Sequence, residues 1–172
     1  MASDTAKLMQ FMLTHGCVPA SELLAFLSAL KRSDGSQMSE ENMSRSVENV
    51  NDRIKNFNMM IRSAYYDKTR TRYYALISTV DNEITRKASH HTEKEFHYFR
   101  SIWQRLVEAK DSSTDGNQSP PTLKDMYTIG KDLKLPNYKE LVEEWSKKYW
   151  LHIEGNDIDL GPRAKLELDV LI

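Results

Sequence analysis

The stretch from Lys147 to Pro162 constrains the fold of this chain more than any other. It holds two short apolar runs on either side of Glu154-Gly155-Asn156, whose glycine and asparagine accept the positive φ of a tight turn. The second run alternates with aspartates, which is the pattern of a half-buried strand. Gly161-Pro162 then ends the strand and begins a helix, because proline fits the first helical position. The apolar residues of the two runs are Trp150, Leu151, Ile153, Ile158 and Leu160. The stretch therefore predicts a two-stranded hairpin followed directly by a helix.

Three helices are predicted ahead of this hairpin. Thr92 and Glu95 have the spacing of a capping box, which begins the first of them. Thr122 with Asp125 begins the second, and the third spans Tyr138 to Lys148. We expect the first helix to bury Phe96, Phe99, Trp103, Leu106 and Val107. We expect the third to bury Leu141, Val142 and Trp145.

The first half of the chain repeats this order of patterns. One helix begins with Asp4 as its cap and ends at His15-Gly16, and a second opens at Pro19-Ala20-Ser21. Ser39 caps a third helix, and a hairpin follows with strands over Met59–Tyr66 and Arg72–Thr79. The third helix has apolar residues at intervals of four and three, which places them on one face: Met43, Val47, Val50, Ile54 and Phe57.

Three helices and a hairpin, occurring twice, are the element order of a winged helix. We therefore predict a mainly α fold with small β-hairpins (α+β), built from tandem winged-helix domains. The predicted limits are residues 1–80 for the first domain, 81–91 for a linker and 92–172 for the second. The polar stretches 31–37 and 111–121 are predicted loops.

Composition narrows the classes of function. The net charge of −1 provides no global field for nucleic acid or a membrane surface, and no apolar run is long enough to predict a membrane span. Cys17 is the single cysteine, which excludes intrachain disulfides and fits the reducing environment of nucleus or cytosol. The histidines at 15, 90, 91 and 97 do not show the ligand spacing of a closed metal shell. We therefore expect no catalytic residue, metal site or cofactor in this chain.

Four short motifs, collinear along the chain, carry a family resemblance. They are Phe11-Met12-Leu13-Thr14-His15-Gly16, Tyr73-Tyr74-Ala75-Leu76-Ile77, Glu95-Phe96-His97-Tyr98-Phe99-Arg100, and Trp150-Leu151 with Leu160-Gly161-Pro162-Arg163-Ala164. They resemble the non-SMC element one family, which supplies a subunit of the SMC five–six complex. The resemblance implies a nuclear role in DNA repair and recombination. It also implies pairing with a MAGE-family subunit and, through that pair, with a kleisin subunit.

The chain departs from this family at its end. Family members continue into a RING-like zinc domain rich in Cys and His, which implies ubiquitin-ligase activity for a whole member. This chain stops at Ile172 with no such cluster. We therefore expect it to be the N-terminal portion of a longer protein, with neither the ligase activity nor the zinc.

Protein binding is the function that the residues favour. The first two helices carry more large apolar side chains than a domain of about 80 residues easily hides. The candidate partner-binding residues are Leu8, Phe11, Met12, Leu23, Phe26 and Leu27. The alternative, that all six belong to the core, stays open at this point.

A DNA-binding regulator is the alternative function. The first hairpin carries the best local basic patch, and such a wing can lie on a phosphate backbone. Its basic residues are Arg62, Lys68, Arg70 and Arg72, which also fit a solvated hairpin tip. The third helix of each half carries carboxylates that would repel phosphates in a major groove. Residues 1–91 hold 12 basic and 10 acidic side chains, against 12 and 15 in residues 92–172. Any contact with DNA is therefore expected in the first half, and without sequence specificity.

Overall fold

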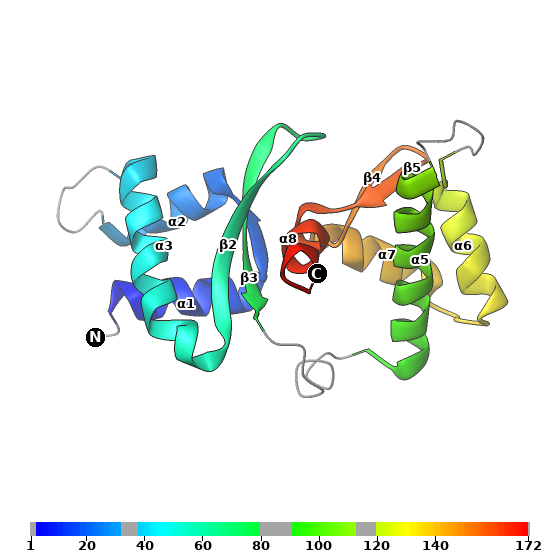
Figure 1. Cartoon of the computed structure of the whole chain (residues 1–172), viewed down its shortest axis with the longest axis horizontal. Helices are drawn as coiled ribbons and strands as arrows, with labels where there is room; N and C mark the ends of the chain where they lie inside the picture. The colour runs from blue at the N-terminus through cyan, green and yellow to red at the C-terminus, as the bar shows by residue number, and fades with distance from the viewer. Residues whose placement is uncertain (1–2, 32–37, 80–90, 113–119, 172) are drawn as a thin grey trace. The chain divides into compact units, whose positions relative to one another are not determined.

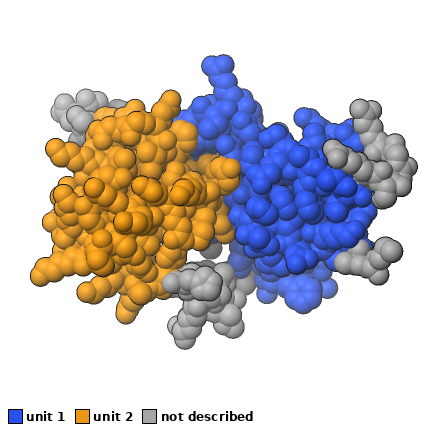
Figure 2. Space-filling view, turned by 180° about the vertical axis from the view of Figure 1, so that it is seen from behind, with its two compact units in different colours: residues 1–82, 165–172 blue, residues 83–164 orange. Residues whose placement is uncertain are grey.

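The computed structural model describes residues 3–31, 38–79, 91–112 and 120–171 (Figure 1). The chain divides into two compact units, Met1–Asn82 with Lys165–Ile172 and Glu83–Ala164 (Figure 2). The predicted loop 31–37, linker 81–91 and loop 111–121 lie largely outside the described residues. The predicted domain limits remain a prediction.

The first unit is mainly helical with one small antiparallel sheet. Its elements are α1 (Asp4–His15), β1 (Cys17–Pro19), α2 (Ala20–Lys31), α3 (Glu40–Ile54), the 3₁₀ helix η1 (Lys55–Phe57), β2 (Met59–Tyr66) and β3 (Thr71–Ser78). Ser39 caps α3 as predicted, since its Oγ accepts a hydrogen bond from the Asn42 N–H at 3.2 Å. The predicted Asp4 cap is wrong. Ser3 caps α1 instead, and Asp4 lies in the first turn, 3.6 Å from Lys7 Nζ.

The sheet has the strand order β1-β3-β2. The hairpin register runs from Met59↔Ser78 to Tyr66↔Thr71, so the second strand begins one residue earlier than predicted. The short strand β1 was not predicted, because three residues are too few to show an alternating pattern. It pairs with β3 through Cys17↔Ala75, which joins the end of α1 to the centre of the sheet.

The core of the first unit lies between its helices and one face of the sheet. It contains Leu8, Met12, Val18, Leu23, Leu27, Met43, Val47, Val50, Ile54, Ile61, Tyr74 and Leu76. The prediction for α3 holds for its four helical positions, but Phe57 is 73% exposed. Phe57 falls in η1, where three residues complete a turn, so the spacing of the α-helix no longer places it on the buried face.

The second unit repeats three helices and a hairpin. Its elements are α5 (Glu93–Ser112), α6 (Leu123–Asp132), α7 (Tyr138–Lys147), β4 (Leu151–Glu154) and β5 (Asp157–Leu160), and α8 (Pro162–Leu171) begins in it. The predicted capping box forms at Thr92–Glu95, and the helix start predicted at Thr122 with Asp125 is a second capping box. The predicted hairpin is confirmed, with Gly155 at φ 62° in its turn. The mixed fold of helices and small antiparallel hairpins is the predicted fold class.

The buried stripe of α5 differs from the prediction. Tyr98, Ile102 and Leu106 are buried, whereas Phe96 is 38% exposed and Phe99, Trp103 and Val107 are only partly covered. Tyr98 enters the core because its hydroxyl donates a hydrogen bond to the carbonyl of Met126 at 2.9 Å. Leu141, Val142 and Trp145 of α7 are buried as predicted. The buried face of α5 therefore includes Tyr98, whose hydroxyl has a hydrogen-bond partner inside the protein, and it differs from the face that the sequence predicted.

Candidate protein interface

An aromatic stack joins α1 and α2 at the surface of the first unit. The rings of Phe11 and Phe26 lie 4.1 Å apart, with an angle of 13° between their planes. His15, one turn after Phe11 on the same helix, places its ring 4.2 Å from that of Phe11 and its Nδ1 2.9 Å from the Phe11 carbonyl. Aromatic pairs of this kind contribute about 0.5–1.5 kcal/mol beyond their buried area. The stack therefore holds a fixed aromatic surface across the two helices.

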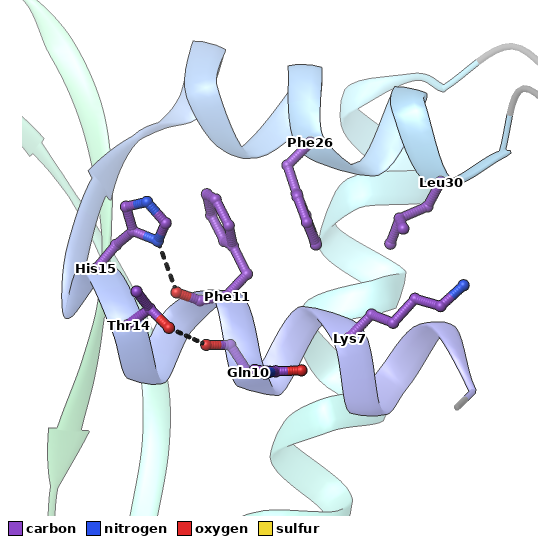
Figure 3. A pocket seen from close by; sticks show the side chains of 7 residues that line it. All are labelled: Lys7, Gln10, Phe11, Thr14, His15, Phe26 and Leu30. Carbon is purple, nitrogen blue, oxygen red and sulfur yellow. Dashed lines mark hydrogen bonds between the residues drawn. The ribbon is translucent and has the colours of Figure 1, made fainter. Parts of the chain in front are cut away.

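A groove of about 350 Å³ lies beside this stack, between α1 and α2 (Figure 3). It is lined by Lys7, Gln10, Phe11, Thr14, His15, Phe26 and Leu30. The hydroxyl of Thr14 donates to the carbonyl of Gln10 at 2.9 Å, so it is already satisfied within the helix. Aromatic anchors surrounded by polar side chains are the arrangement that carries binding energy in protein interfaces.

The structure separates the six predicted partner-binding residues into two groups. Phe11 and Phe26 are partly buried and line the groove. The other four lie in the core, which is the alternative that the sequence left open for them: Leu8, Met12, Leu23 and Leu27. Leu8 and Met12 are four residues apart on α1, and Leu23 and Leu27 are four residues apart on α2. Each pair therefore lies on one face of its helix, and that face packs inward.

Leu13 is a surface residue that the predicted set omitted. It lies on α1 and is 58% exposed, which is high for a large apolar side chain. Its position one residue beyond Met12, which is fully buried, turns it away from the core. The angular position of Leu13 on the helix, relative to the buried Met12, was the sequence signal that could have identified it as exposed.

The four predicted DNA-binding residues all lie on the β2–β3 hairpin. Arg62 is half-buried, and Lys68, Arg70 and Arg72 are exposed. Arg72 Nη1 donates a hydrogen bond to Ser63 Oγ at 3.2 Å. Among the described residues, no carboxylate forms an ion pair with Arg62, Arg70 or Arg72. The hairpin thus presents a basic surface, and its contact with DNA remains a prediction.

The described residues show no site for metal or membrane chemistry. No group of three or more His, Cys, Asp or Glu side chains in these ranges is arranged to hold a metal ion. Cys17 is buried in β1. In the part of the chain that the structure describes, no helix has the length and apolarity to cross a bilayer.

Comparison with known proteins places these features in a family. Residues 6–134 match the family model of Nse1, the non-SMC component of the SMC5-6 complex. Because this match covers more than half of the chain, the chain belongs to the Nse1 family, a class of non-SMC component of the SMC5-6 complex. This confirms the resemblance that the four sequence motifs indicated.

Curated relatives and a solved structure extend this result. The chain is 22% identical over 165 residues to the non-structural maintenance of chromosomes element 1 homolog of Xenopus tropicalis, and 23% identical over 163 residues to that of Xenopus laevis. Each match covers 95% of this chain and 60% of the relative, so the chain spans about three fifths of their length. A chain of the solved Nse1-Nse3-Nse4 complex has a TM-score of 0.77 and 19% identity, with coverage of 98% of this chain and 72% of that one. The two chains therefore share a fold.

Proposed function

We propose that this chain is a non-catalytic docking scaffold of the SMC5-6 complex, built from tandem winged helices and acting in the nucleus in DNA repair and recombination. Its partners are a MAGE-family subunit and, through that pair, a kleisin subunit. The observation that carries this proposal is family membership together with a fold match over 98% of the chain to a chain of the solved Nse1-Nse3-Nse4 complex. Ubiquitin-ligase activity and its zinc are assigned to the remainder of a whole family member.

The α1–α2 groove is the proposed docking surface for the MAGE-family subunit. Its aromatic stack is already ordered in the free chain, so little side-chain entropy is lost when a partner covers it. Phe11 and Phe26 are the proposed anchors, because their stacked rings line the groove. A few well-packed anchor residues account for most of the binding energy at protein interfaces.

A titration of the MAGE-family subunit into variant chains tests the groove. Phe26→Ala removes one half of the stack and is expected to weaken binding about tenfold or more. Phe57→Ala is the matched control, because Phe57 is 73% exposed but lies in η1, outside the groove. We expect the control to bind as the natural chain does. Equal losses in both variants, or no loss in either, would exclude the groove as the docking surface.

A further inference from the structure

Strand β2 forms one edge of the three-stranded sheet, because the strand order is β1-β3-β2. In an antiparallel ladder, every second residue turns both its N–H and its C=O away from the neighbouring strand. Ile61 is such a residue, since the N–H of its partner Leu76 bonds to the Gly16 carbonyl on the β1 side at 2.9 Å. Counting onward in twos, Ser63 and Tyr65 also direct their backbone polar groups out of the sheet.

Asn51 of α3 closes this edge at one position. Its Nδ2 donates to the Ile61 carbonyl at 2.9 Å, and its Oδ1 accepts from the Ile61 N–H at 2.7 Å. The side-chain amide thus occupies the place that a paired strand would take. The outward backbone groups of Ser63 and Tyr65 have no such partner among the described residues. Both residues are exposed, Tyr65 to 54%. The edge is therefore closed at Ile61 and open over 63–65, where proteins usually cover or blunt it.

The hairpin that carries the open edge is basic. The hairpin from residue 59 to 78 carries Asp67 as its single acidic side chain. Arg72 faces Tyr65 across the ladder and donates a hydrogen bond to Ser63 Oγ, so one guanidinium lies beside both edge residues. The remaining basic side chains of the hairpin are Arg62, Lys68 and Arg70. A partner of negative charge complements this surface.

We propose that the open edge over 63–65 binds an extended acidic peptide segment of a partner protein, which adds a strand to β2. Main-chain hydrogen bonds provide affinity in strand addition, and neighbouring side chains provide selectivity. The edge favours a peptide over nucleic acid because it alternates N–H donors with C=O acceptors. Phosphates supply only acceptors and would meet the carbonyls of Ser63 and Tyr65 unfavourably. This surface is distinct from the α1–α2 groove and does not depend on it.

Amide hydrogen exchange on the natural chain tests the proposal without any substitution. In the free chain, we expect the inward amides of Arg62 and Ala64 to exchange slowly and those of Ser63 and Tyr65 to exchange fast. A capped octapeptide of alternating threonine and glutamate is expected to slow the two outward amides by about tenfold or more. The same peptide with lysine in place of glutamate is expected to give no protection. Unchanged exchange with the acidic peptide, or equal protection by both peptides, would overturn the proposal.

A matched pair of variants tests whether the outward N–H of Ser63 binds the peptide. Ser63→Pro removes an N–H that the ladder to β3 does not use, so the hairpin keeps its pairing while the edge loses a donor. Ser63→Ala removes the hydroxyl contact with Arg72 and keeps the N–H. We expect Ser63→Pro to weaken binding of the acidic octapeptide about tenfold and Ser63→Ala by less than about twofold.

Two results of this comparison would contradict strand addition. One is an equal loss of peptide binding in both variants, which would assign the effect to the hydroxyl. The other is a duplex oligonucleotide that binds the hairpin where the acidic peptide does not, which would assign the basic side chains to phosphate. If Ser63→Pro does not fold, the exchange measurement on the natural chain still decides.

Discussion

Glu95 connects the start of α5 to the start of α7. Its Oε2 accepts a hydrogen bond from the Thr92 N–H at 2.7 Å, and its Oε1 accepts one from Asn137 Nδ2 at 2.9 Å. The Asn137 bond and then the Thr92 bond lower the pKa of the Glu95 carboxyl below its ordinary 4.5. His91 lies 3.8 Å from the same carboxylate and makes a smaller contribution in the same direction. The capping residue that the sequence indicated is thus also a tertiary contact.

Substitution of Glu95 is expected to change the response of the fold to acid. Because the folded chain has the lower pKa at this carboxyl, the unfolded chain binds the proton first, and the free energy of unfolding falls as the pH drops below about 4.5. Glu95→Gln removes this contribution, so we expect a loss of about 1 kcal/mol at neutral pH and a shallower decline with acid. Urea unfolding at several pH values measures both, with exposed Glu93→Gln as the control. Parallel pH curves for the natural chain and Glu95→Gln would refute this role.

Gly130 sets the separation of α6 from its neighbours. A Cβ at this position would lie 2.4 Å from Tyr138 Cβ and 3.0 Å from Tyr98 Cζ. Alanine is the better helix former by about 0.5–1 kcal/mol, but overpacking costs about 1–3 kcal/mol. We therefore expect Gly130→Ala to destabilise the second unit, as thermal unfolding would show. Thr128→Ala, at an exposed position of the same helix, is expected to change little. A gain in stability for Gly130→Ala would mean that helix propensity outweighs packing here.

At the scale of elements, Asn51 joins α3 to the edge of the sheet. Asn51→Ala leaves the N–H and C=O of Ile61 without their partners, and both hydrogen bonds are part-buried. We expect a loss of about 1–3 kcal/mol in the free energy of unfolding and faster exchange of the Ile61 amide. Asn49→Ala is the control, since Asn49 is exposed on the same helix. If Asn51→Ala matches the control in both measurements, the side-chain amide does not close the strand.

Local signals determined which elements the sequence predicted correctly. Ser39 and the two capping boxes mark helix starts because their side chains bond to backbone only three residues away. Where distant contacts decide, the predictions were wrong or absent. Strand β1 exists because β3 offers it a partner, and Tyr98 is buried because Met126 offers its hydroxyl an acceptor. In the sequence, β3 is far from β1 and Met126 is far from Tyr98.

The candidate site shows the same limit at the scale of the whole molecule. The apolar pattern of the first two helices identified residues that avoid water, but it did not say which of them another element covers. Four of the six pack inward, while Phe11 and Phe26 reach the groove. The open edge of β2 was not predictable, because it depends on strand order and on Asn51 reaching Ile61. The four collinear motifs were nevertheless enough to indicate the family.

Complex formation with a MAGE-family subunit tests the proposed scaffold role most directly. The two purified chains would be mixed at low salt and analysed by size-exclusion chromatography with light scattering. The scaffold role predicts one stable complex with one copy of each chain, to which a kleisin subunit then adds. Separate elution of the two chains under these conditions would contradict it.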